Sequence, residues 1–227
     1  MRASVSGGFR APDFKELYLR FVNASAGYAV DGNAALRPEH SINTTAEAEW
    51  VSGGLDLRAN VFHNRIRDLI ETIGPDVQGH YTYDNVGLAT TSGAELEAGR
   101  RWRAAEVRLG YSYLHTHDVT LGGPILGRAA HSGRGTIDTP VWRRLRLAVT
   151  GVYTGDSPAA RDSLGRVSMV REGMMQVNMR AAHPIPAWAG TGEIFGGVDD
   201  VFDVQRGYDW PGFTGRQLSV GLSWPGR

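Results

Sequence analysis

The stretch "QLSVGLSW" (Gln217–Trp224) alternates strictly between two kinds of residue. Leu218, Val220, Leu222 and Trp224 occupy every second position, and the residues between them are polar or glycine. Successive side chains of a β-strand point to opposite faces, so a period of two places these apolar residues on one face. The stretch therefore predicts a strand with one apolar and one polar side.

The same alternation runs through much of the chain, as in the segments 107–113, 145–149 and 175–179, and helical spacing is nowhere sustained. We predict ten strands, near residues 2–9, 41–52, 55–70, 85–100, 104–117, 130–139, 144–155, 172–183, 190–200 and 215–224. Long connections near 10–40, 71–84, 118–129, 156–171 and 201–214 alternate with short ones at 53–54, 101–103, 140–143 and 184–189. Short periplasmic turns and long external loops are typical of outer-membrane barrels.

Composition removes several other classes of protein. Lys+Arg and Asp+Glu are balanced at 24 each, so no overall charge favours binding to nucleic acid. The chain contains no cysteine, which excludes disulfides and thiolate chemistry. No apolar run approaches the roughly 18 residues of a membrane-spanning helix. A membrane barrel is compatible with all of this, because every second residue of its strands faces a polar interior.

The tryptophans give a second indication of a membrane barrel. Five of the 6 lie at or beside the predicted short connections or the last strand end: Trp50, Trp102, Trp142, Trp188 and Trp224. Aromatic residues gather where a membrane meets water, so we expect these five to form a girdle. A soluble β-propeller is the alternative, but its repeats hold four short strands, whereas each interval between these tryptophans holds two long ones.

Two boxes near the start of the chain carry a family resemblance. "GFRAPDFKELY" (Gly8–Tyr18) and "GNAALRPEHS" (Gly32–Ser41) resemble the paired boxes in the barrel of TonB-dependent outer-membrane receptors. The matching residues are Phe9, Arg10, Ala11, Pro12, Asn33, Leu36, Pro38 and Glu39. The segments "YDNVGLATTSGAELE" (Tyr83–Glu97) and "GGVDDVFDVQRGYDWPGFTGRQLSVGLSW" (Gly196–Trp224) are similar to later landmarks of the same family.

The resemblance implies an all-β fold, an antiparallel transmembrane barrel segment with about ten strands of a 22-stranded barrel. We expect residues 1–227 to be the C-terminal barrel portion of such a receptor, without its plug domain and N-terminal strands. The implied location is the bacterial outer membrane. The implied function is energy-coupled uptake of a scarce ligand, with a ferric siderophore favoured. A cobalamin receptor, a receptor for another ligand, or a small passive porin are the alternatives.

The resemblance also implies partners. These are outer-membrane lipid and lipopolysaccharide, the plug domain and TonB in the full-length protein, and the small ligand; no cofactor, metal or nucleic acid is expected. External loops of the family help to capture ligand, and aromatic side chains offer rigid surface for a chelate. Candidate ligand-binding residues in the predicted long loops are Tyr18, Phe21, Tyr28, Tyr208 and Trp210.

Other chemistry is disfavoured. His115 and His117 would share one face of a strand, but their register continues that of Tyr111 and Tyr113 and places them outward, so metal ligation is disfavoured. Asp199 and Asp200 would point to opposite faces, which spoils a shared catalytic site with Asp203. We therefore expect no enzyme.

Arginines on the predicted polar faces have a different role. Arg108, Arg146 and Arg180 would face the barrel interior. There we expect them to pair with carboxylates such as Glu95 and Glu97, or to contact a plug domain.

Overall fold

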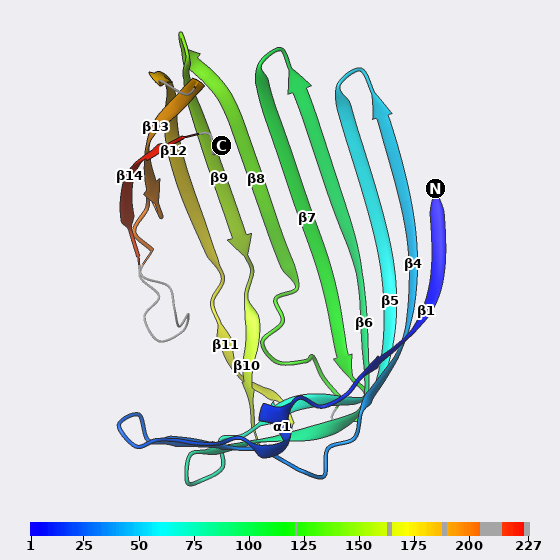
Figure 1. The fold of residues 1–227 in the computed structure, drawn as a ribbon. Coiled ribbons are helices and arrows are strands. Elements are labelled where there is room, and N and C mark those ends of the chain that lie inside the picture. The colour runs from blue at the N-terminus through cyan, green and yellow to red at the C-terminus, as the bar shows by residue number, and fades with distance from the viewer. Residues whose placement is uncertain (121, 163–164, 188–189, 205–214, 225–227) are drawn as a thin grey trace.

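The computed structural model describes residues 1–120, 122–162, 165–187, 190–204 and 215–224. Ten long strands form one curved antiparallel sheet in the order β1-β4-β5-β6-β7-β8-β9-β12-β13-β14 (Figure 1). Strands β1 and β14 form its two edges, and no pairing among the described residues joins them. The spatial order of these ten strands is the same as their order along the chain, as in an up-and-down barrel wall.

The bounds of these strands are β1 Arg2–Arg10, β4 Glu39–Ser52, β5 Leu55–Ile73, β6 His80–Trp102, β7 Ala105–Asp118, β8 His131–Trp142, β9 Leu145–Thr154, β12 Met174–Ala187, β13 Gly190–Asp199 and β14 Gln217–Ser223. All ten predicted strands are present in the predicted order, which confirms the all-β fold class. Strands β5 and β6, with 19 and 23 residues, extend further into the external loops than their alternation indicated.

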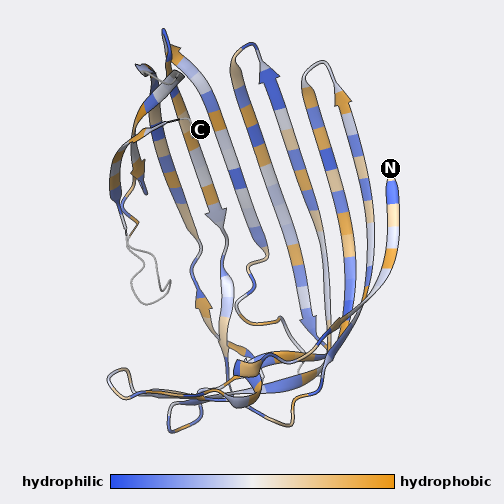
Figure 2. Ribbon diagram, viewed as in Figure 1, coloured by the Kyte–Doolittle hydropathy of each residue, from blue (hydrophilic) through white to orange (hydrophobic). Residues whose placement is uncertain are grey.

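Hydrophobic and hydrophilic residues alternate along the strands (Figure 2), so the two faces of the sheet differ in chemistry. One face presents large exposed apolar side chains, such as Leu96, Leu109 and Val220. The other face carries ion pairs between neighbouring strands, such as that between Arg58 and Glu97. The core is correspondingly sparse, because a barrel wall has lipid on one side and the interior of the barrel on the other. We call these the outward and the inner face.

The short turns lie at one end of the sheet and the long loops at the other (Figure 1). Gly53 and Gly54 connect β4 to β5 with φ angles of 56° and 79°. Positive φ at both central residues is the requirement of a type I′ hairpin turn, which glycine meets without strain. Arg103 and Arg143, in the β6–β7 and β8–β9 turns, also have positive φ.

The segment 10–40, which we predicted as a loop, contains regular structure. It holds the helix α1 (Phe14–Tyr18) and the short strands β2 (Arg20–Asn23) and β3 (Tyr28–Asp31). Strand β3 pairs with β2 and, in parallel, with the start of β6. The segment therefore folds across the end of the sheet that carries the long loops (Figure 1).

A second long connection also contains strands. The segment 156–171 holds the hairpin of β10 (Ser157–Arg161) and β11 (Val167–Arg171), which form a separate two-stranded sheet. Among the described residues, no helix has the length and apolar character needed to cross a membrane.

Candidate functional site

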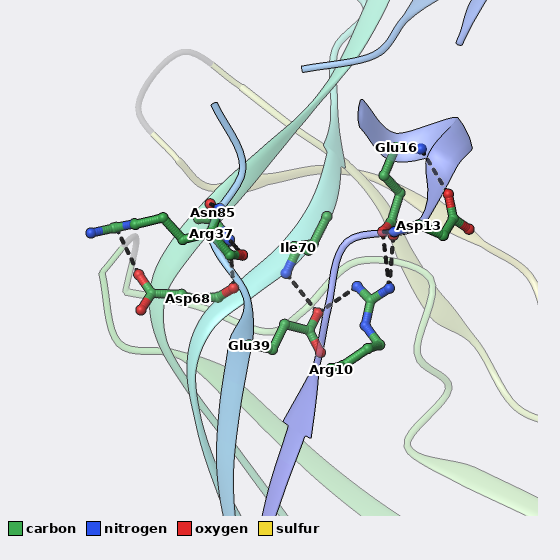
Figure 3. A network of polar contacts seen from close by, with 8 residues as sticks. All are labelled: Arg10, Asp13, Glu16, Arg37, Glu39, Asp68, Ile70 and Asn85. Atoms are coloured by element: carbon green, nitrogen blue, oxygen red, sulfur yellow. Dashed lines mark hydrogen bonds and ion pairs between the residues drawn. The ribbon is translucent and has the colours of Figure 1, made fainter. Parts of the chain in front are cut away.

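The two family boxes meet at the external end of β1 and β4, on the inner face (Figure 3). Arg10 and Glu39 are directly paired across these strands, and their side chains form an ion pair at 2.6 Å. The same Glu39 oxygen accepts a hydrogen bond from the backbone N–H of Ile70 in β5, at 2.8 Å. Arg10 also donates to both carboxylate oxygens of Glu16 at 3.0 Å. One arginine thus joins β1, β4 and helix α1.

This contact changes the acidity of both partners, which lie beyond the membrane-spanning part of the strands. The hydrogen bond to Glu39 raises the pKa of Arg10 above its ordinary value. Burial tends to raise the pKa of Glu39, but the hydrogen bonds from Arg10 and from the Ile70 amide outweigh it, and the pKa is lowered. Glu39 is therefore a carboxylate at neutral pH and holds two strands beside its own.

Helix α1 begins with a capping box. The Asp13 side chain accepts from the backbone N–H of Glu16 at 2.8 Å, and the Glu16 side chain accepts from the N–H of Asp13, also at 2.8 Å. Ala11 and Pro12 form the break between β1 and this helix. Proline has no N–H to continue a sheet ladder, so the chain leaves β1 and enters the helix at this point.

The second box is attached to β6 by asparagine side chains. Asn85 accepts from the backbone N–H of Arg37 and donates to the carbonyls of Arg37 and Asp68, at 2.8, 2.9 and 2.7 Å (Figure 3). Asn33 donates to the carbonyl of Tyr83 at 2.9 Å. Arg37 also forms an ion pair with Asp68 at 2.7 Å.

Three stretches far apart in the sequence, at residues 9–18, 33–40 and 83–85, thus form one assembly, which we call the rim latch. Leu36, in the second box, is 8% exposed. Phe9 packs against His40 on the outward face, with ring centroids 5.4 Å apart. Pro38 precedes Glu39 at the start of β4. The motif residues therefore hold the external segment in place, which sequence spacing alone did not reveal.

The predicted ligand-binding aromatics fall into two groups. The ring centroids of Phe21 on β2 and Tyr28 on β3 are 6.0 Å apart. The Tyr28 ring also lies edge-to-face against Tyr81 of β6, with centroids 6.2 Å apart. Tyr18 packs against Phe14 at 5.2 Å on α1. Tyr81 is not among the predicted residues, because its position depends on the parallel pairing of β3 with β6. Tyr208 and Trp210 lie outside the described residues.

The inner face carries a ladder of ion pairs along the wall. Arg58 lies within 3.4 Å of three carboxylates. The full ladder pairs Arg2 with Glu47; Arg58 with Glu47, Glu49 and Glu97; Arg101 and Arg108 with Glu106; Arg146 with Asp138; and Arg180 with Glu193. Glu95 accepts a hydrogen bond from Asn60. The predicted arginines do pair with acids, although with nearer carboxylates than Glu95 and Glu97.

The aspartates considered for catalytic chemistry have local structural partners at the end of β13. No group of three or more His, Asp or Glu residues in the described part of the chain is arranged to hold a metal ion. Asp200 is fully buried, and its side chain accepts from the backbone N–H of Val204 at 2.6 Å. Asp203 accepts from the N–H of Arg216 at 3.0 Å. These aspartates shape the end of β13 and the turn that follows.

Four of the five tryptophans predicted to form a girdle lie at the end of the sheet with the short turns. Trp50, Trp102 and Trp142 are 53%, 65% and 63% exposed beside the turns that follow their strands. Trp224, after β14, is 48% exposed. The guanidinium groups of Arg103 and Arg143 lie over the rings of Trp102 and Trp142. Trp188 lies outside the described residues.

Comparison with known proteins identifies relatives of the chain. It is 34% identical over 140 residues to the iron-regulated outer membrane virulence protein of Vibrio cholerae serotype O1, a match that covers 56% of this chain and 21% of that protein. It is 25% identical over 164 residues to the vitamin B12 transporter BtuB of Vibrio vulnificus, covering 72% of this chain and 25% of that protein. The chain thus spans about a quarter or less of these relatives.

Solved structures share the fold. The copper transporter OprC aligns with a TM-score of 0.69 at 14% identity, covering 89% of this chain and 31% of that one. The ferric enterobactin receptor PfeA of Pseudomonas aeruginosa aligns with a TM-score of 0.67 at 16% identity, covering 89% and 32%. The family model described as "TonB dependent receptor-like, beta-barrel" matches residues 1–201. The chain therefore belongs to the TonB-dependent receptor β-barrel family of the bacterial outer membrane.

Proposed function

We propose that residues 1–227 form the C-terminal barrel portion of a receptor that takes up a ferric siderophore by coupling to TonB. The observation that carries this proposal is the rim latch. It fixes the segment 10–40 over the external end of the wall and so presents an ordered aromatic surface made by Phe21, Tyr28 and Tyr81. Rigid aromatic faces suit the apolar parts of a chelate surface, because they bury area at little conformational cost.

The choice of an iron chelate is supported by the relatives. The Vibrio cholerae protein is named as iron-regulated, and PfeA is a ferric enterobactin receptor. The match to BtuB keeps cobalamin as the alternative ligand. Transport is the activity proposed for the whole receptor, so we assign no catalytic residue to this chain.

The inner face supports the proposed contact with a plug domain. Its arginines and carboxylates present hydrogen-bonding groups of both signs to whatever fills the barrel. A plug would contact this ladder, and TonB would act on the plug from the side of the short turns. A passive porin would need these ten strands to close on themselves.

Uptake of iron-55 by cells that express the receptor tests the proposal. We expect ferric siderophore uptake that stops when TonB is deleted. We also expect the siderophore to bind about 5- to 30-fold more weakly after Tyr28→Ala, since one aromatic contact and its buried area are lost. Tyr153→Ala is the matched control, because Tyr153 is exposed on the outward face. Uptake that persists without TonB would instead support a porin, and uptake of cyanocobalamin alone would support the alternative ligand.

A further inference from the structure

The external hairpin of β2 and β3 leaves one strand edge without a neighbour. Strand β2 pairs with β3 on one side, and β3 pairs in parallel with β6 on its other side. In the described part of the chain, β2 has no hydrogen-bonded strand other than β3. Arg20, Phe21 and Val22 of β2 are all exposed. We call these three residues the open edge.

The register of the hairpin shows which backbone groups of the open edge point away from β3. The carbonyl of Leu19 accepts a hydrogen bond from the N–H of Gly32 at 2.6 Å, one pair beyond the end of the ladder. Antiparallel residues alternate between hydrogen-bonded and non-hydrogen-bonded pairs, so Phe21 is bonded to β3, whereas Arg20 and Val22 are not. The N–H and C=O groups of Arg20 and Val22 therefore point outward, where a further strand would bind.

The open edge is held in place by the strands behind it. The N–H of Ala29 in β3 donates to the carbonyl of Gly79 at 3.1 Å, and Ala29 is 6% exposed. The rim latch fixes the chain just after β3, where Asn33 donates to the carbonyl of Tyr83. An added strand would meet a fixed template, so most of the conformational cost of binding would fall on the incoming peptide.

The open edge lacks the features that protect strand edges. Proteins protect exposed edges with proline, lysine or a bulge, or cover them with another segment. Strand β10 of the other external hairpin is protected in this way. It contains Pro158 and register shifts, and the Pro158 carbonyl accepts from the N–H of Gly127 at 2.7 Å. Strand β2 contains neither proline nor lysine, and its register with β3 is regular.

The side chains of the open edge favour one kind of partner. The Arg20 side chain is 87% exposed, and its Nε lies 3.9 Å from a carboxylate oxygen of Asp31 in β3. A carboxylate opposite Arg20 on an added strand would thus meet a guanidinium that is mostly open to solvent. A second copy of the chain would bring another arginine-bearing edge instead. Charge therefore favours an acidic partner over a second copy.

We infer that the open edge binds an extended, acidic segment of an external polypeptide by strand addition. Main-chain hydrogen bonds to Arg20 and Val22 supply the affinity in this mode of recognition. Arg20 selects a carboxylate on the added strand. Phe21 lies on the opposite face of β2 and contacts an apolar side chain next to that carboxylate in the peptide. This partner is separate from the siderophore and does not depend on TonB.

The test uses the full receptor, purified in mild detergent, and the synthetic peptide Val-Thr-Val-Glu-Val-Thr-Val. Saturation-transfer NMR measures binding, and hydrogen exchange by mass spectrometry should show that the peptide protects the amides of Arg20 and Val22. Val22→Pro removes an N–H that β3 does not use, so binding should weaken at least about fivefold, the net value of one backbone hydrogen bond. Unchanged protection of the Ala29 amide shows that the hairpin is intact in this variant. Val22→Thr is the matched control, because it keeps the N–H and suits a strand.

Two altered peptides test the mode of binding on the unchanged receptor. A peptide that is N-methylated at alternate residues keeps its side chains but loses backbone donors, so it should not bind. A peptide with lysine in place of glutamate should bind up to about fivefold more weakly, the range of a cross-strand charge pair. Equal binding of the N-methylated peptide would overturn strand addition, and equal binding of the lysine peptide would overturn the acidic preference.

The receptor alone distinguishes the other possible occupants of the open edge. Protection of the Arg20 and Val22 amides without peptide would mean that another part of the receptor covers the edge. Dimers that form without peptide and are lost in Val22→Pro would assign the edge to a second copy. Either result would overturn the inference. The assay contains neither siderophore nor TonB, so its failure would leave the proposed uptake function untouched.

Discussion

Replacing Glu39 by alanine should loosen the external ends of β4 and β5 without unfolding the wall. The substitution removes the acceptor of the Ile70 amide, and Ile70 is only 7% exposed, so water does not readily replace the lost bond. A buried donor without a partner costs about 1–3 kcal/mol. The lost ion pair with Arg10 adds about 1 kcal/mol or less, since the Arg10 side chain is 44% exposed.

The local cost of Glu39→Ala is therefore about 1–4 kcal/mol, which raises the open population of this region about 5- to 900-fold. Hydrogen exchange of the Ile70 amide, measured by mass spectrometry on the purified receptor, reports this opening directly. Glu49→Ala is the control in the same strand, because Glu49 forms an exposed ion pair with Arg58. Protection of Ile70 that is equal in Glu39→Ala and in the unchanged protein would refute the reasoning.

Three further predictions concern the wall and the rim latch. Gly93→Ala should destabilise the barrel by about 1–3 kcal/mol, because a Cβ at this position would clash with the Phe62 ring and the Tyr113 backbone oxygen. Gly110→Ala is the control, because a Cβ there has room. The two variants are compared by the temperature at which the folded band is lost on gels. Asn85→Asp should expose the segment 33–39 to proteases more than Asn85→Ala does, because a carboxylate would face two carbonyls. Because the pKa of Glu39 is lowered in the folded protein, its full contribution to the stability of the rim latch is present above pH 4.5 and is lost as the pH falls through the lowered pKa. Hydrogen exchange of the Ile70 amide, corrected for its intrinsic pH dependence, should therefore rise at that low pH and not at higher pH.

The wall could be predicted from the sequence because its signal is long and local. Alternation over ten or more residues defines a strand with two different faces, and the glycines and tryptophans mark the turns. Strand β12 extends past its predicted end to Ala187 although it contains Pro184 and Pro186. Strand β9 pairs with β12 only as far as Ala182, so in the described part of the chain both prolines pair with β13 and not with β9.

The rim latch could be predicted only in part. The capping box of Asp13 and Glu16 is a sequence signal for a helix start, although the segment 10–40 is predicted as a loop. Strands β2 and β3 have four residues each, too few for a period of two to be recognised. The parallel pairing with β6 joins segments about fifty residues apart, and no local pattern specifies such a contact. Tyr81 was missed for this reason.

The ion-pair ladder of the inner face has a consequence for how a charged ligand would travel. Among the described residues, six arginines and six carboxylates pair there, so their electric fields largely cancel within a few ångströms of the wall. A passing anion would meet neither a deep electrostatic trap nor a barrier along these pairs. Selection for the sign of the ligand charge would then occur at the external loops, before the ligand enters the barrel. The inner face of this part of the wall would not discriminate further by charge.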